Sequence, residues 1–285
     1  MRSRLVSRPA AALMLALAAL VAGCATNPVT HKRELVLVTP AQEAALGREG
    51  HTATLAEYGA YDDAALAAYV DSVGRRVARA SDQPGLPWRF TILDDAVVNA
   101  FALPGGYIYV TRGLLAHLQS EAQLAGVLGH EIGHVTRRHS IKQMQKAQGA
   151  NVGVTLACVL TGICNNGLAN AGIQIAAGGV FAKFSRDDEA EADREGVKTV
   201  IRAGIDPTGI PEMFRILLDE RKARPGGVDQ FFLSHPLEES RIAATQSMIG
   251  TYPPDVVRGL TKDSPNFQAF KKRLQSLPPS PPSKR

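Results

Sequence analysis

One short stretch, His130-Glu131-Ile132-Gly133-His134, limits what this chain can fold into more than any other feature. On an α-helix, residues four positions apart lie on one face, so the two imidazoles are placed one above the other. Two neutral imidazoles at this spacing can bind one Zn²⁺, with the intervening glutamate beside an open coordination position. The alternative interpretation is a pair of core histidines next to a solvated glutamate.

The residues around this stretch favour the zinc-binding interpretation. Ser120 followed by Gln123 is a capping-box pattern, which predicts a helix from Ser120 through Gln143. Apolar residues then recur at helical spacing at Leu124, Val127, Leu128, Ile132 and Val135. The two histidines are therefore expected on one face of one helix.

Two histidines supply only part of a catalytic zinc site, because such a site normally has three protein ligands and leaves the fourth position to water. The extended pattern with a third histidine farther along the same helix is absent, since that position is Ser140 and position 137 is Arg. His139 is one residue out of register on a continuous helix. We therefore expect the third ligand on a second helix, most simply as a carboxylate.

The acidic run at residues 187–193 supplies candidates for this ligand. Glu189 and Asp193 share one helical face, so that Glu189 could bind zinc while Asp193 orients a ligand histidine. Asp187 and Glu191 form the equivalent pair on another face. Periodicity alone does not choose between the two pairs.

Together, the zinc helix and the sequence Ser185-Arg-Asp-Asp-Glu-Ala-Glu-Ala-Asp193 resemble the M48 family of zinc metallopeptidases. The resemblance is to periplasmic lipoproteins rather than polytopic membrane members, and it covers about residues 60–250. It includes Asn99-Ala-Phe-Ala-Leu-Pro-Gly-Gly106 and Ser234-His235-Pro236 with Arg241. It implies an α+β, mainly helical, gluzincin-like metalloprotease domain with a small sheet packed on the zinc helix. Functions tied to the helical-repeat extension of some relatives are not expected here.

The resemblance also assigns the metal site. The third ligand of the family is the Glu of a Glu-x-x-x-Asp motif, which corresponds to Glu189, with Asp193 as its Asp. It thus implies one Zn²⁺ per chain, held by His130, His134 and Glu189. Zinc would lower the pKa of its bound water and polarise the scissile carbonyl. Glu131 would take the proton of that water and return it to the leaving amine.

A donor to the developing oxyanion is also needed, and His235 and Arg241 are the candidates. His235 has a competing interpretation as a fourth zinc ligand that keeps the enzyme latent. A third interpretation is an ordinary surface histidine at a helix start, before Pro236. The sequence leaves these roles open.

An exposed edge strand beside the zinc helix binds extended substrate in metalloproteases of this general type. Residues 99–103 are our candidate, and with Tyr107–Thr111 they flank a Pro-Gly-Gly turn typical of a hairpin. The candidate substrate-binding residues are Asn99, Ala100, Phe101 and Ala102. An ordinary core hairpin is the alternative.

The first residues predict export and a lipid anchor. Three arginines in the first eight residues precede an apolar run over residues 9–21, and a Val-Ala-Gly-Cys sequence ending at Cys24 resembles a bacterial lipobox. We expect residues 1–23 to be removed and Cys24 to be lipidated, because the apolar run is short for a membrane-spanning anchor. Ala25 in place of Asp favours the outer over the inner membrane, on the periplasmic face of the cell envelope.

Charge and cysteine content narrow the partners further. The formal net charge of +5 falls to about +2 once the three arginines of the signal peptide are removed. No basic cluster with interleaved aromatic residues remains, so nucleic acid is not an expected partner. In an oxidising periplasm Cys158 and Cys164 are expected to form a local disulfide, with a free buried pair as the alternative.

The expected organisation is a signal peptide (1–23), a lipidated linker and helix (24–60), a peptidase domain (61–250) and an extension (251–285) with a Pro-rich disordered tail. Order is expected to thin from Thr251. The expected function is zinc-dependent endopeptidase activity on misfolded or misassembled envelope proteins. The alternative is a periplasmic chaperone or assembly factor for outer-membrane proteins with a latent or dispensable zinc site.

Overall fold

The computed structural model describes residues 24–26, 33–35, 38–146, 183–223, 228–236 and 239–280. The predicted signal peptide and the pair Cys158 and Cys164 lie outside the described residues, so the predictions about them stay predictions. Within these ranges, no helix is both long enough and apolar enough to cross a membrane.

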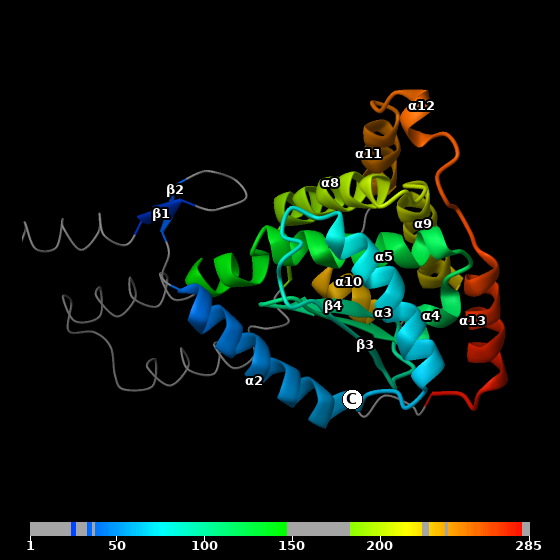
Figure 1. The fold of residues 1–285 in the computed structure, drawn as a ribbon, viewed down its shortest axis with the longest axis horizontal. Helices are drawn as coiled ribbons and strands as arrows, with labels where there is room; N and C mark the ends of the chain where they lie inside the picture. Colours follow the sequence, from blue (N-terminus) through cyan, green and yellow to red (C-terminus); the bar gives the residue numbers. More distant parts are fainter. Residues whose placement is uncertain are drawn as a thin grey trace, which may run out of the picture.

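A small sheet lies near the centre of the fold (Figure 1). Its strands are β3 (Arg89–Leu93), β4 (Ala100–Leu103) and β5 (Tyr107–Thr111), in the order β3-β5-β4. β3 runs parallel to β5, whereas β4 pairs with β5 antiparallel. Gly105 and Gly106 close this predicted hairpin with φ values of 81° and 97°, a region that favours glycine. The hairpin places β4 at one edge of the sheet.

Helix α5 (Glu121–Thr136) is the central element, and each of its residues is buried. It lies between the sheet and α8 (Arg186–Arg202), and α3 (Ala64–Arg79) and α9 (Gly209–Ala223) pack against its remaining sides (Figure 1). Because α5 is covered all round, small and apolar residues occupy most of its positions. The mainly helical α+β architecture with a small sheet on this helix confirms the predicted fold class.

The backbones of α5 and α8 approach each other closely at two glycines. A Cβ atom on Gly133 would lie 2.8 Å from the carbonyl oxygen of Ala192 on α8, and one on Gly196 would lie 3.3 Å from the backbone nitrogen of His130. Side chains at these positions would push the helices apart. The close approach brings the acidic face of α8 against the histidine face of α5.

Side-chain caps mark the starts of three helices, including the predicted start at Ser120. α2 (Pro40–Tyr58) begins after Thr39, which forms a capping box with Gln42. Asp63 caps α3, and Ser120 caps α5 by accepting a hydrogen bond from the backbone of Gln123. The end of α5 differs from the prediction, because α5 stops at Thr136 and a second helical segment begins at residue 139.

The expectation that order thins from Thr251 is wrong for most of the following residues. After α10 (Asp229–Ser234) and α11 (Glu239–Ile249), the chain continues through α12 (Pro254–Val257) to α13 (Pro265–Ser276). α13 packs on α3 and α4 (Arg112–His117). Three of its side chains are buried in the main core: Phe267, Phe270 and Leu274. Their spacing of three and four residues is an amphipathic signal that the surrounding prolines obscured.

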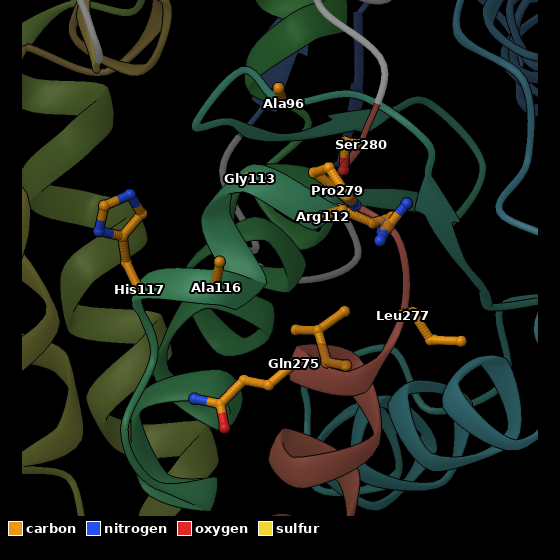
Figure 2. A pocket seen from close by; sticks show the side chains of 10 residues that line it. Ala96, Arg112, Gly113, Ala116, His117, Gln275, Leu277, Pro279 and Ser280 are labelled. Atoms are coloured by element: carbon orange, nitrogen blue, oxygen red, sulfur yellow. The ribbon is translucent and has the colours of Figure 1, made fainter.

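Two features lie apart from the predicted site. Strands β1 (Cys24–Thr26) and β2 (Arg33–Leu35) form a separate antiparallel pair. Figure 2 shows a hollow between α4, the end of α13 and the chain that follows it, lined in part by Arg112, Gln275 and Pro279. None of the predicted site residues lines this hollow.

Candidate active site

Four buried side chains converge where α5, α8 and the end of α10 meet. His130 and His134 come from α5, Glu189 from α8, and His235 follows α10 as its C-cap residue. One ligand atom from each lies within 4.8 Å of the others. The two α5 imidazoles face each other with their Nε2 atoms 3.1 Å apart, and Nδ1 of His235 lies 3.3 Å from Nε2 of His130. The predicted His130, His134 and Glu189 are thus brought together.

The donor set fits a zinc ion. Imidazole nitrogens and a carboxylate oxygen are ligands that zinc prefers, and a tetrahedral site needs atoms this close together. Both carboxylate oxygens of Glu131 are buried, and no group in the described part of the chain donates a hydrogen bond to either. A carboxylate buried without donors is costly unless an ion or water compensates for it. The residues present therefore match a metal centre with a carboxylate beside it.

Asp193 lies behind the first histidine. Its Oδ1 is 3.0 Å from Nδ1 of His130, on the side of the ring opposite the donor set. Such a carboxylate fixes the tautomer and orientation of a ligand histidine. The sequence analysis predicted that Asp193 lies beside a ligand histidine and orients it.

Arg241 lies between the two α8 carboxylates. Its Nε and Nη2 donate to the two oxygens of Asp193 at 2.8 and 2.7 Å, and its Nη1 lies 2.6 Å from Oε2 of Glu189. Nη1 also donates to the carbonyl of Pro236 at 3.0 Å. With these contacts, the placement favours support of the carboxylates over the predicted role as an oxyanion donor.

His235 belongs to the same cluster. Its side chain is buried, so the interpretation as an ordinary surface histidine is wrong. Nδ1 lies 3.1 Å from Oε1 of Glu189, and Nε2 lies 3.6 Å from Oε1 of Glu131. One ring nitrogen therefore points into the donor set, and the other points toward the predicted general base.

The electrostatics of the two glutamates differ. Burial raises the pKa of Glu131, against the opposing influence of His235 and His130. Burial also acts to raise the pKa of Glu189, but His235, His130 and His134 outweigh it and hold that pKa well below the usual range. Glu189 is thus held as an anion that can bind a cation, while Glu131 is poised to take up a proton.

The candidate substrate strand packs directly on α5. β4 is one of the two edge strands of the sheet, as expected of a strand that binds an extended peptide. The side chains of Ala100, Phe101 and Ala102 are all buried, so any peptide contact here would come from the backbone. The buried Oδ1 of Asn99 has no hydrogen-bond partner among the described residues. Binding of substrate at this strand stays a prediction.

Sequence reasoning missed two neighbours of His134. Nδ1 of His139 lies 2.9 Å from Nδ1 of His134, and the ring of Phe184 stacks on His134 with centroids 4.0 Å apart. His139 was expected to be out of register because the helix was assumed to continue. Instead α5 ends, and Arg138 adopts a φ of 57° that redirects the chain. A histidine shortly after the second ligand was the available signal.

Comparison with known proteins agrees with this geometry. The model of the family described as "Peptidase family M48" matches residues 64–249. The chain is 33% identical over 201 residues to a putative beta-barrel assembly-enhancing protease of Vibrio cholerae, a match covering 68% of this chain and 41% of that protein. It is 28% identical over 257 residues to the mitochondrial metalloendopeptidase OMA1 of Schizosaccharomyces pombe, covering 86% and 72% of the two chains. It is also 33% identical over 158 residues to the metalloprotease YcaL of Escherichia coli, covering 55% and 60%. The chain spans less than half the length of the Vibrio relative.

Proposed function

The chain belongs to peptidase family M48, and on that premise we propose that it is a zinc-dependent metalloendopeptidase acting on misfolded or misassembled proteins of the bacterial cell envelope. The observation that carries this proposal is the arrangement around Glu131. A buried carboxylate without hydrogen-bond donors in the described residues lies beside a buried donor set of three histidines and one glutamate. A structural zinc site has no need of such a carboxylate.

In the proposed mechanism, His130, His134 and Glu189 would hold zinc, with Asp193 beside His130 and Arg241 paired with Glu189. Zinc, when bound, supplies a Lewis acid that acidifies water and polarises the scissile carbonyl. Glu131 then takes a proton from the attacking water, while the water oxygen forms a bond to the carbonyl carbon.

Completion of the reaction requires the same proton to move again. Glu131 passes it to the leaving nitrogen as the C–N bond breaks, which releases an amine and a carboxylic acid. An extended substrate backbone alongside β4 would present the scissile bond to this carboxylate. An unfolded segment meets this requirement more easily than a compact domain, because its backbone groups are unpaired.

We further propose that His235 acts as a fourth ligand that keeps the enzyme latent. Its Nδ1 lies within hydrogen-bonding distance of both His130 and Glu189, inside the donor set. A ligand there would take the position that water needs. Movement of the segment that carries His235 would open this position to water, so removal of the imidazole should activate the enzyme.

A role in assembly without proteolysis is the second candidate function. The four-donor set favours it, because a zinc site closed by His235 is catalytically idle. The name of the Vibrio relative, putative beta-barrel assembly-enhancing protease, combines assembly with protease activity. A function in assembly alone does not explain the buried carboxylate of Glu131, because a binding protein needs no general base.

We propose attachment to the periplasmic face of the outer membrane through a lipid on Cys24. The support is the lipobox-like sequence before Cys24 and the residue that follows it. Metabolic labelling with a radioactive fatty acid should label the wild-type chain, and Cys24→Ser should abolish the label. Equal labelling of both proteins would refute the anchor.

The enzymatic proposal is tested with the chain lacking residues 1–24. Zinc content is measured by emission spectroscopy, and cleavage of unfolded casein is followed before chelation, after chelation and after zinc is restored. We expect one zinc per chain, loss of cleavage on chelation, recovery with zinc, and faster cleavage by His235→Ala. Stoichiometric zinc without cleavage of any unfolded protein, in either form, would favour the assembly function instead.

A further inference from the structure

We propose that His139 and Glu191 form a positioning relay that fixes the tautomer and ring orientation of His134, and thereby sets the zinc affinity of the site. The inference rests on the zinc centre of the proposed function. His139 and Glu191 are neither proposed zinc ligands nor the proposed general base.

The geometry separates the two nitrogens of His134. Nε2 faces the donor set, 3.1 Å from Nε2 of His130 and 3.4 Å from Oε1 of Glu189. Nδ1 points away from the set and lies 2.9 Å from Nδ1 of His139. Two ring nitrogens this close form a hydrogen bond only if one carries a proton and the other does not.

Zinc binding determines which nitrogen of His134 carries the proton. Nε2 of His134 binds the metal through its lone pair, so its proton must sit on Nδ1. Nδ1 of His139 is then the acceptor, and the proton of His139 sits on Nε2. That nitrogen lies 3.1 Å from Oε2 of Glu191, which accepts its hydrogen bond. Each donor in the relay thus has its acceptor, ending on a carboxylate.

The surroundings hold the relay in place. The side chain of His139 is fully buried, so water does not compete for its nitrogens. Nε of Arg137 lies 3.5 Å from Oε1 of Glu191, an ion-pair distance that favours the charged carboxylate. Oδ1 of Asp188 lies 3.8 Å from Nε2 of His139 and adds negative charge at the same end.

The backbone is bent to make the contact. Arg138 has a φ of 57°, in the left-handed region that residues other than glycine adopt rarely. Its backbone nitrogen donates to the carbonyl of Val135, and its side chain is held by Glu43 with Nε 2.9 Å from Oε2. Without this turn a continuous helix would carry His139 away from His134. Strain held in place by an ion pair at such a position is typical of functional sites.

The relay completes a pattern of support behind the two α5 ligands. Behind His130, Oδ1 of the Asp193 carboxylate lies 3.0 Å from Nδ1. His134 is supported by Glu191 through an intervening imidazole. Loss of such outer partners typically lowers metal affinity by about 10- to 100-fold.

The test is zinc affinity, measured by competition with a chromophoric chelator on the full mature chain and needing no substrate. His139→Leu removes the acceptor, and we expect its zinc affinity to fall by about 10- to 100-fold. His139→Asn places an amide oxygen near the former Nδ1, and we expect it to recover most of that loss. The matched control is Ile141→Val, a buried apolar change in the same helical segment, which should lower the melting temperature slightly and leave zinc affinity unchanged.

The outcomes separate the two proposals. A wild-type chain that binds no zinc would refute the proposed metal centre, whereas equal affinities of wild type and His139→Leu would refute the relay alone. If His139→Leu does not fold, the relay is tested on the zinc-bound wild type instead. Imidazole ¹⁵N–¹H correlations then show which ring nitrogens of His134 and His139 carry protons. Protons on Nδ1 of His134 and Nε2 of His139 support the relay, and any other placement overturns it.

Discussion

Helix α5 buries two glutamates and surrounds them in opposite ways. At its first residue, Glu121 accepts hydrogen bonds from the hydroxyls of Tyr69 and Ser264, the former at 2.7 Å, and from Nη1 of Arg76 at 3.3 Å. Farther along, Glu131 is equally buried and receives no hydrogen bond from any described residue. The helix therefore has one carboxylate with partners on several elements and one with none.

This difference indicates that Glu121 has a structural role and Glu131 a chemical one. The partners of Glu121 come from α3 and from the turn before α13, so this carboxylate ties the C-terminal helix to the core. A fully satisfied buried carboxylate stabilises a fold, whereas an unsatisfied one costs stability and is kept where its chemistry is needed. The same substitution at the two sites should thus have opposite consequences.

The largest effect is expected from Glu131→Gln on catalysis. An amide cannot take up the proton of the attacking water, so kcat/KM on unfolded casein should fall by about 10²- to 10⁴-fold. The melting temperature should stay the same or rise, because a buried charge without donors becomes neutral. Both are measured on protein with equal zinc content, and unchanged cleavage would remove Glu131 from the mechanism.

The second prediction concerns the approach of α8 to the Glu131 end of α5. A Cβ on Gly133 would meet the carbonyl oxygen of Ala192 at 2.8 Å, so Gly133→Ala should destabilise the chain by about 1–3 kcal/mol. Because the helices separate at the donor set, zinc affinity should fall as well.

Gly85→Ala is the matched control, since no atom lies within 4 Å of its added Cβ. Urea unfolding and chelator competition measure the two properties. Retention of wild-type zinc affinity by Gly133→Ala would show that the close approach of the helices is not needed for the metal site.

The third prediction is the mirror of the first. Glu121→Gln weakens charge-assisted hydrogen bonds from Tyr69, Arg76 and Ser264, so the free energy of unfolding should fall by about 1.5 kcal/mol. Zinc affinity and kcat/KM of the folded protein should not change. A loss of activity without loss of stability at Glu121 would contradict the division between the two glutamates.

The smallest effect is expected at a third carboxylate, Asp63. Like Glu121 it has partners, because it caps α3 and pairs with Arg273. The hydrogen bond from Arg273 holds the pKa of Asp63 below its usual value. Stability from a carboxylate with a lowered pKa is present above its unfolded-state pKa and is lost as the pH falls through its folded-state pKa.

Asp63→Asn keeps a capping oxygen and removes the charge. It should therefore lower stability slightly at neutral pH and make no difference once the pH is below the lowered pKa of the wild-type carboxyl. Urea unfolding at several pH values measures this change. A stability difference that does not shrink in acid would show that the charge of Asp63 is not what stabilises the chain.

Much of the site was accessible from spacing alone. The four-residue interval of His130 and His134 placed both on one face, and the same interval made Glu189 and Asp193 a candidate pair. Periodicity left Asp187 and Glu191 as equal competitors, and only the packing of α5 on α8 shows that Glu191 instead faces His139. Local pattern gives the faces of a helix but not which neighbour each face meets.

The missed features depend on contacts between distant segments. Nothing in the residues around Arg138 signals a left-handed turn, since its ion pair with Glu43 comes from α2. The guanidinium of Arg241 was interpreted as aimed at substrate, whereas it pairs with two carboxylates of α8. The chain after Thr251 was expected to lose order, but Phe267 and Phe270 of α13 pack in the core beside Tyr69.

The most direct test of the central claim is anomalous diffraction at the zinc edge from crystals of the zinc-loaded chain. We predict one peak per chain, bonded to Nε2 of His130, Nε2 of His134, a carboxylate oxygen of Glu189 and, in the latent state, Nδ1 of His235, with Glu131 beside it but outside bonding distance. A peak bonded to Glu131, or a stoichiometric zinc ion elsewhere in the chain, would contradict the account.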